Sequence, residues 1–141
     1  MKFVLDSNIL FSALISGKEL YIDVFKVLQI YVPDFIFREI SKYEDRIIKN
    51  TKVENEFVFF VRELFSEITV IPKLGISQEN YKKALTLCAD IDPKDTAYIA
   101  LSLELDIRIW TNDKVLIKGL IDKGFTNIIT TEEIFKLIIM K

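Results

Sequence analysis

The most informative stretch of the sequence is residues 92–113, DPKDTAYIALSLELDIRIWTND. It opens with Asp92-Pro93, a pair typical of helix starts, because an Asp side chain caps the first turn and proline has no N–H to leave unpaired there. Residues 96–105 are apolar on nearly every side, which predicts a helix buried in the middle of the domain. Residues 108–110 then read as a short strand. A buried helix that begins with acids, followed by a strand that ends at Asp113, suggests a functional site.

The bulk composition predicts one ordinary globular domain, residues 1–141, with 50% hydrophobic and 28% charged residues. The longest run without charge, residues 7–17, is far shorter than the ~20 apolar residues that span a bilayer. Asp6 interrupts the apolar N-terminus, so we expect no signal peptide. The single cysteine, Cys88, is expected to be buried and forms no disulfide framework. We therefore expect a cytoplasmic protein.

The composition also excludes several chemistries. The chain has no histidine, which rules out a Ser-His-Asp triad and any histidine general base. One cysteine cannot build a structural zinc site, and the four glycines are not spaced as in a phosphate-binding loop. The net charge of −2 argues against a protein that coats nucleic acid through bulk charge, but not against local binding around a metal. Carboxylates remain, and with them hard divalent cations.

Strand patterns alternate with helical patterns along the chain, which predicts a three-layer α/β/α fold around a parallel sheet of four to five strands. The helix starts carry candidate caps. Ser7 or Asn8 is expected to cap the helix that stops at Gly17, Asp34 the helix over residues 35–49, and Ser77 the helix ending at Cys88. Expected strands are 2–5, 30–32, 69–71, 108–110 and 127–129, and the remaining expected helices are 19–29, 51–67, 92–105, 114–123 and one after the capping box Thr130-x-x-Glu133.

Acids follow the strands at the edge where such sheets bind ligands, beyond the carboxyl ends of the strands. Asp6 and Asp113 come directly after the first and fourth expected strands, and Asp95 begins the helix that leads into the fourth. If those two strands are neighbours, the three side chains converge. Glu39 can join them from the helix after the second strand.

Four pieces of the sequence together resemble the PIN-domain nucleases, the family that includes the VapC toxins of bacterial and archaeal toxin–antitoxin pairs. They occur in the family's order and spacing and span nearly the whole chain. The pieces are VLDSNIL (4–10), VPDFIFREI (32–40), DPKDTAYIALSLEL (92–105) and WTND (110–113).

The resemblance implies a sheet of strand order 3-2-1-4-5 and a ribonuclease that depends on Mg²⁺ or Mn²⁺. It also implies a catalytic quartet of acids: Asp6, Glu39, Asp95 and Asp113. Of these, Asp6, Asp95 and Asp113 are expected to bind the metal. Asn8 and Thr111 carry over as polar groups that support these acids or face the substrate. One departure is Val115, where many relatives have a further Asp, and this implies that a second metal is held less firmly or not at all.

Each acid also has a purely structural interpretation. Asp6 and Asp113 can cap the helices that follow them, and Asp95 is a first-turn acid of the kind that the helix dipole favours by ~0.3–1 kcal/mol. Glu39 alone is typical of a solvated helix face. Asp92 is best explained as a cap, with a place in the acidic site as its alternative. The coincidence of acids at strand ends favours function for Asp6, Asp95 and Asp113.

The leading hypothesis is a metal-dependent endoribonuclease that cleaves single-stranded RNA and is the toxin of a type II toxin–antitoxin pair. Metal ions held by carboxylates activate water and neutralise phosphoryl oxygens without histidine, so the chemistry agrees with the resemblance. The surplus of apolar helices predicts a homodimer or an antitoxin partner, because exposed apolar patches mark partner surfaces.

Two rival functions stay open. VLDSNIL also resembles the opening of haloacid-dehalogenase-type phosphatases, in which the Asp after the first strand is the nucleophile, but Asn8 stands where the second Asp of that motif belongs. The other rival is a non-catalytic PIN scaffold that binds RNA or protein, and the retention of all four acids speaks against it.

Overall fold

The computed structural model describes residues 1–140; Lys141, the last residue of the expected domain, lies outside this range. The strands are β1 (Lys2–Leu5), β2 (Gln29–Pro33), β3 (Ile68–Ile71), β4 (Arg108–Trp110) and β5 (Ile128–Ile129). The α-helices are α1 (Ser7–Ser16), α2 (Glu19–Val27), α3 (Ile36–Asn50), α4 (Phe57–Ser66), α5 (Gln78–Cys88), α6 (Thr96–Leu105), α7 (Lys114–Asp122) and α8 (Thr131–Ile139). Short 3-10 turns are η1 (Glu54–Glu56), η2 (Lys73–Gly75) and η3 (Pro93–Asp95).

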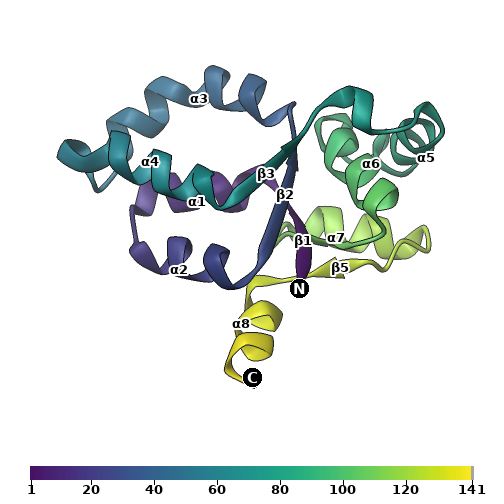
Figure 1. The fold of residues 1–141 in the computed structure, drawn as a ribbon. Helices are drawn as coiled ribbons and strands as arrows, with labels where there is room; N and C mark the ends of the chain where they lie inside the picture. The colour runs from purple at the N-terminus through teal and green to yellow at the C-terminus, as the bar shows by residue number, and fades with distance from the viewer. Residues whose placement is uncertain (141) are drawn as a thin grey trace.

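The strands form one parallel sheet in the order β3-β2-β1-β4-β5. In the centre, Val4 of β1 lies between Tyr31 of β2 and Ile109 of β4. Figure 1 shows α1 to α4 on one side of the sheet and α5 to α7 on the other, while α8 extends away from the last strand. The predicted three-layer α/β/α fold and its strand order are confirmed.

The centre of the molecule consists of β1 and α6. Phe3, Val4 and Leu5 are all buried, because helices cover both faces of the sheet. In α6 every residue from Ala97 to Ser102 is buried, as the apolar pattern predicted. Ser102 satisfies its hydroxyl by donating to the carbonyl oxygen of Ile107 at 2.6 Å. Cys88 is fully buried, as expected. No helix within residues 1–140 is long and apolar enough to cross a membrane.

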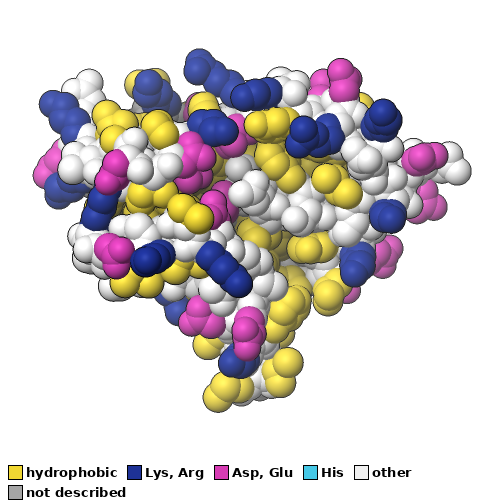
Figure 2. All heavy atoms as spheres, turned by 180° about the vertical axis from the view of Figure 1, so that it is seen from behind, with side chains coloured by type: hydrophobic (Ala, Val, Ile, Leu, Met, Phe, Trp, Pro, Cys, Tyr) yellow, Lys and Arg dark blue, Asp and Glu magenta, His cyan; other side chains and the backbone are white. Residues whose placement is uncertain are grey.

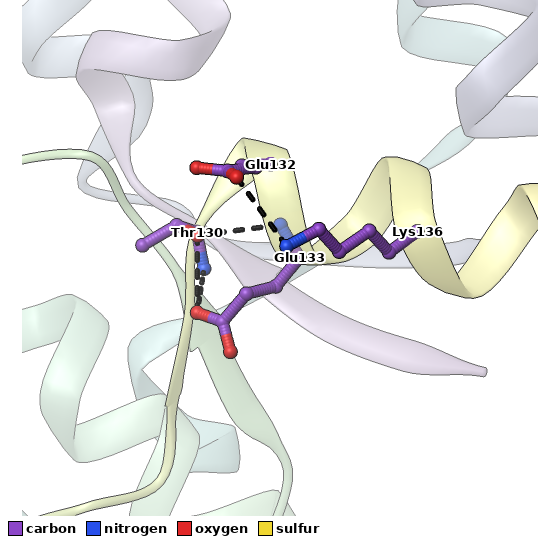
Figure 3. A network of polar contacts seen from close by, with 4 residues as sticks. All are labelled: Thr130, Glu132, Glu133 and Lys136. Carbon is purple, nitrogen blue, oxygen red and sulfur yellow. Dashed lines mark hydrogen bonds and ion pairs between the residues drawn. The ribbon is translucent and has the colours of Figure 1, made fainter.

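Several predicted helix ends are confirmed. Gly17 ends α1 at φ 62, in the left-handed region that favours glycine. Ser77 caps α5 by accepting a hydrogen bond from the Asn80 N–H. The capping box of α8 is complete: Thr130 accepts from the N–H of Glu133, whose carboxylate accepts from the N–H of Thr130 (Figure 3). These signals lie within four residues of sequence, so they can be recognised without the fold.

Other expected helix starts are wrong. Asp6, not Ser7 or Asn8, occupies the N-cap position of α1, and its side chain makes no capping bond. Asp34 does not cap α3, because its carboxylate accepts a hydrogen bond from the backbone N–H of Lys73 at 3.1 Å and so holds the chain after β3.

The helix expected from residue 51 begins later, at Phe57 after the η1 turn. The cause is a contact distant in sequence. The Thr51 hydroxyl donates to the carbonyl oxygen of Leu14 at 2.9 Å, and the Lys52 N–H donates to that of Ile15 at 2.9 Å. These bonds hold the connecting segment along the end of α1 and delay the next helix.

Candidate active site

The ends of β1 and β4 are joined by hydrogen bonds at the point where the strand order reverses, which is where open α/β sheets bind ligands. The N–H of Asp6 donates to the carbonyl oxygen of Trp110 at 3.0 Å. The hydroxyl of Thr111 donates to Asp6 Oδ2 at 2.7 Å. Asp6 is only 2% exposed and Thr111 is fully buried. Thr111 therefore holds one oxygen of the Asp6 carboxylate, and its role in supporting the acids stays a prediction.

Asp92 and Asp95 occupy the two ends of one 3-10 turn. Asp92 Oδ1 accepts a hydrogen bond from the N–H of Lys94 at 3.0 Å, so the predicted capping role of Asp92 is present. Asp95 is the last residue of η3, directly before α6, and its side chain makes no capping bond. The expected single helix from residue 92 is thus a tight turn followed by α6. This leaves the Asp95 carboxylate available for another contact.

Asp113 has the helix-capping role that was its structural alternative. Its Oδ1 accepts hydrogen bonds from the N–H groups of Val115 and Leu116, both at 3.1 Å, at the start of α7. Thr111 also accepts a bond from the N–H of Asp113 at 3.1 Å, which links this acid to the Asp6 contact. Capping uses only Oδ1, so Oδ2 can still take part in a site.

Glu39 is held by two hydroxyl groups that were not among the predicted site residues. Tyr98 of α6 donates a short hydrogen bond to Glu39 Oε1, and Ser7 of α1 donates to Oε2 at 3.2 Å. Glu39 is therefore a fixed, half-buried side chain and not a solvated one. A sequence signal for Tyr98 existed, because a tyrosine in a buried apolar helix needs a partner for its hydroxyl. The identity of that partner depends on the fold.

These residues surround a hollow of about 470 Å³. Its walls include Asn8, Glu39, Asp92, Asp95 and Asp113, together with the cationic side chains of Lys94 and Arg46. Asp6 is buried next to them and is close enough to raise the pKa of both Asp95 and Glu39. The structure thus brings all four predicted catalytic acids to one edge of the sheet, with the exposed Asn8 beside them.

Burial and crowding raise the pKa values of Asp6, Glu39 and Asp95. Burial raises the pKa of Asp95 from 3.8 to about 7, and the negative charges of Asp6, Asp92, Asp113 and Glu39 add to the effect. Burial also raises the pKa of Asp6, against the hydrogen bond from Thr111. For Glu39 burial again raises the pKa, while the Tyr98 and Ser7 hydroxyls oppose it. Each carboxylate therefore lacks sufficient positive charge nearby.

The donor set fits a hard divalent cation. The available ligands are carboxylate oxygens, and Mg²⁺ prefers one or two such oxygens together with water and substrate phosphate. As positioned, residues 1–140 contain no group of three Asp, Glu or Cys side chains that could hold a metal ion together. A set of three direct ligands, Asp6, Asp95 and Asp113, stays a prediction. A cation held by one or two carboxylates and by water agrees with the oxygen donors of the hollow and with the absence of a three-ligand group within residues 1–140.

Comparison with known proteins gives the family. No curated protein matches the chain. The PIN-domain profile matches residues 4–134, which contain all four acids and, apart from Lys2 and Phe3 of β1, every strand of the sheet. Members of this family are generally nucleases and usually use divalent metals. On the strength of this match and of the strand order, the chain belongs to the PIN-domain family.

Proposed function

We propose that this protein is a metal-dependent endoribonuclease that cleaves single-stranded RNA. One observation carries the proposal: in a chain of a nuclease family, Asp6, Asp95 and Asp113 lie near the switch point of the sheet, where the charges of Asp6 and Asp113 help to raise the pKa of Asp95 and the charge of Asp113 helps to raise the pKa of Asp6. Such crowding costs stability unless a cation offsets it. The substrate of a cation site lined with acids and without histidine is expected to be a phosphodiester.

In this proposal Asp6, Asp95 and Asp113 hold one or two Mg²⁺ or Mn²⁺ ions. A bound ion supplies an activated water and neutralises charge on the phosphoryl oxygens. Glu39, fixed by Tyr98 and Ser7, is placed to accept a hydrogen bond from the attacking water and orient it. Thr111 donates to Asp6 Oδ2 and so fixes the orientation of that carboxylate. Asn8, exposed on its rim, is available to the RNA.

The phosphatase alternative agrees less well with the same geometry. Asn8 takes the position of that motif's second Asp, and it lies exposed at the hollow without a carboxylate to offer. The non-catalytic scaffold makes a different prediction: Asp6→Asn leaves its biological effect unchanged. Activity assays therefore separate all three functions.

The experiment uses purified protein with unpaired RNA, single-stranded DNA, duplex RNA and a small phosphate ester, each with Mn²⁺, with Mg²⁺ and with EDTA. We expect cleavage of the unpaired RNA alone, in the presence of metal. Cleavage that persists in excess EDTA would contradict the proposed dependence on a metal ion. Release of phosphate from the small ester without RNA cleavage would favour the phosphatase.

The proposal includes a role as the toxin of a toxin–antitoxin pair. Exposed apolar side chains on two helices support an additional partner or a homodimer: Phe59 of α4 is 69% exposed and Ile139 of α8 is 81% exposed. Figure 2 shows such apolar side chains on the extended C-terminal helix. We expect expression to arrest bacterial growth, and Asp95→Asn to relieve the arrest. Normal growth at full expression of an active nuclease would contradict the toxin role. Size-exclusion chromatography tests the homodimer by giving the apparent molecular mass of the purified protein.

A further inference from the structure

A second cleft, of about 530 Å³, lies beside the acidic hollow. It lies between the start of α3, the η2 turn after β3, the first turn of α5, and the η3 turn with the start of α6. Its walls carry three cationic side chains, Arg38, Lys73 and Lys94, and three aromatic ones, Phe35, Phe37 and Tyr81. The residues that form it are distant in the sequence, and none of them was among the predicted site residues.

The cleft and the acidic hollow are adjacent. Lys94 lines both of them. On α3, Arg38 faces the cleft and its neighbour Glu39 lines the hollow. On the far side, Thr96 lines the cleft and its neighbour Asp95 the hollow. A chain held in the cleft therefore lies next to the acidic hollow.

Within residues 1–140, the cations of this cleft form no ion pair with a carboxylate, although Lys94 is near enough to Glu39 to lower its pKa slightly. The ion pairs of this range lie elsewhere: one is on α5, one on α8, and one joins Lys123, just after α7, to Asp90, just after α5. The one acid in the cleft wall, Asp34, accepts a bond from the Lys73 backbone N–H, which leaves the Lys73 ammonium free. Figure 2 shows Lys and Arg side chains gathered at the upper edge of the molecule, over the region where β2 and β3 end in Figure 1. In a protein of net charge −2, such a local concentration of positive charge favours an anion.

The aromatic residues indicate which anion. Phe37 is 51% exposed although it lines the cleft, and its ring stacks on that of Phe65 with centroids 6.3 Å apart. Lys73 Nζ lies 5.6 Å from the centre of the Tyr81 ring, so a cation and an aromatic face occur together. Cations that track phosphates and aromatic rings that stack on bases are the two features of sites for single-stranded nucleic acid.

We propose that this cleft binds the single-stranded RNA next to the phosphate that is cleaved. Arg38, Lys73 and Lys94 hold phosphates, and the exposed ring of Phe37 stacks on a base. The inference rests on the proposed nuclease function and extends it, because it assigns where the uncleaved part of the substrate lies. Lys94, shared by both cavities, contacts the phosphate nearest the acids.

The test measures binding in EDTA, so that it does not depend on cleavage. A short, unpaired, fluorescein-labelled RNA is titrated with wild type and variants at a series of salt concentrations, and fluorescence anisotropy gives the Kd. Lys73→Ala and Arg38→Ala are expected to weaken binding, and each should reduce the salt slope of log K by about 0.7, the value for one phosphate contact on a single strand. Lys73→Ala keeps the backbone N–H that binds Asp34.

Two matched controls lie outside the cleft. Lys83→Ala removes the same charge from the far side of α5, where Lys83 forms an exposed ion pair with Glu79, and should leave both the Kd and the salt slope unchanged. Phe37→Ala should weaken binding by about fivefold or more, whereas Phe59→Ala, which removes an even more exposed ring from α4, should not. Circular dichroism melting checks that each variant is folded.

The outcomes separate this inference from the proposed function. Unchanged Kd and salt slope in the folded Arg38, Lys73 and Phe37 variants, with cleavage intact, would overturn the cleft and leave the nuclease. Weaker binding in these variants, with no metal-dependent cleavage by wild type, would support the cleft and contradict the nuclease. A poly-glutamate peptide that binds the cleft while RNA does not would mean that an acidic protein segment is the occupant, and the proposal would be wrong.

Discussion

Thr111 and Asp6, 105 positions apart in the sequence, are joined by a buried hydrogen bond of 2.7 Å. The bond connects the residue after β4 to the residue after β1. It gives the Asp6 carboxylate a partner in a place where burial raises its pKa. The same threonine oxygen accepts a bond from the N–H of Asp113, so a single side chain positions two of the acids.

Thr111→Val should therefore destabilise the protein, because it leaves a buried carboxylate oxygen without its donor. The expected loss is about 1–3 kcal/mol in the free energy of unfolding, measured by urea denaturation at neutral pH. Thr126→Val, at an exposed position, is the control and should change stability by less than about 0.5 kcal/mol. Equal stability of both variants would mean that the Thr111 bond contributes nothing.

Asp92 and Asp95 should differ in their effect on activity. Asp95→Asn is expected to lose nearly all RNA cleavage, because its carboxylate lies among the other acids. Asp92→Asn should keep most of it, because Asn caps a turn as well as Asp does and the capping bond to Lys94 can persist. Initial cleavage rates with Mn²⁺ measure both. Equal losses would place Asp92 within the catalytic site.

Metal should stabilise wild type more than the acid variants. Carboxylates about 4 Å apart repel by about 4 kcal/mol at an effective dielectric of 20, so Asp6→Asn or Asp113→Asn should be at least as stable as wild type in EDTA. The asparagine side chain introduced by the second substitution can still cap α7. A metal ion at a concentration of 100 times its Kd stabilises the folded protein by about 2.7 kcal/mol. Both variants should lose most of this stabilisation. Thermal unfolding with EDTA and with Mn²⁺ measures it.

If these variants instead melt well below wild type in EDTA and still gain the usual amount from Mn²⁺, then Asp6 and Asp113 are structural residues. The proposed site would then be wrong, whatever the activity of the protein.

The raised pKa of Asp95 predicts a pH dependence of stability. Its pKa of about 7 in the folded protein is above the ordinary 3.8, so the folded state holds this proton more tightly than the unfolded chain does. Without metal, this group's contribution to stability is present at low pH and is lost as the pH rises from about 4 to about 7. Asp95→Asn removes this loss. In EDTA, urea denaturation should show that the free energy of unfolding of the variant increases relative to that of wild type as the pH rises. The opposite trend would contradict the raised pKa.

The order of the helices and strands could be predicted from the sequence, because the patterns that define them are local. The buried helix α6, the strand after it and the caps at Ser77, Asp92 and Thr130 were all recognisable from residues a few positions apart. The acids at the strand ends were recognisable in the same way. The strand order came from the family resemblance, since periodicity does not say which strands are neighbours.

The sequence by itself therefore determined the elements, the burial of α6 and the candidate acids. Only the tertiary structure decided how the acids are held, because each supporting bond joins distant segments: Tyr98 to Glu39 across 59 positions, and Thr111 to Asp6 across 105. It also decided that Asp34 holds the η2 turn and does not cap a helix. The cleft of Arg38, Lys73 and Lys94 likewise exists only after folding, because its walls come from four separate segments. The partner of a side chain depends on which residues the tertiary packing brings within bonding distance, and local sequence patterns do not contain that information.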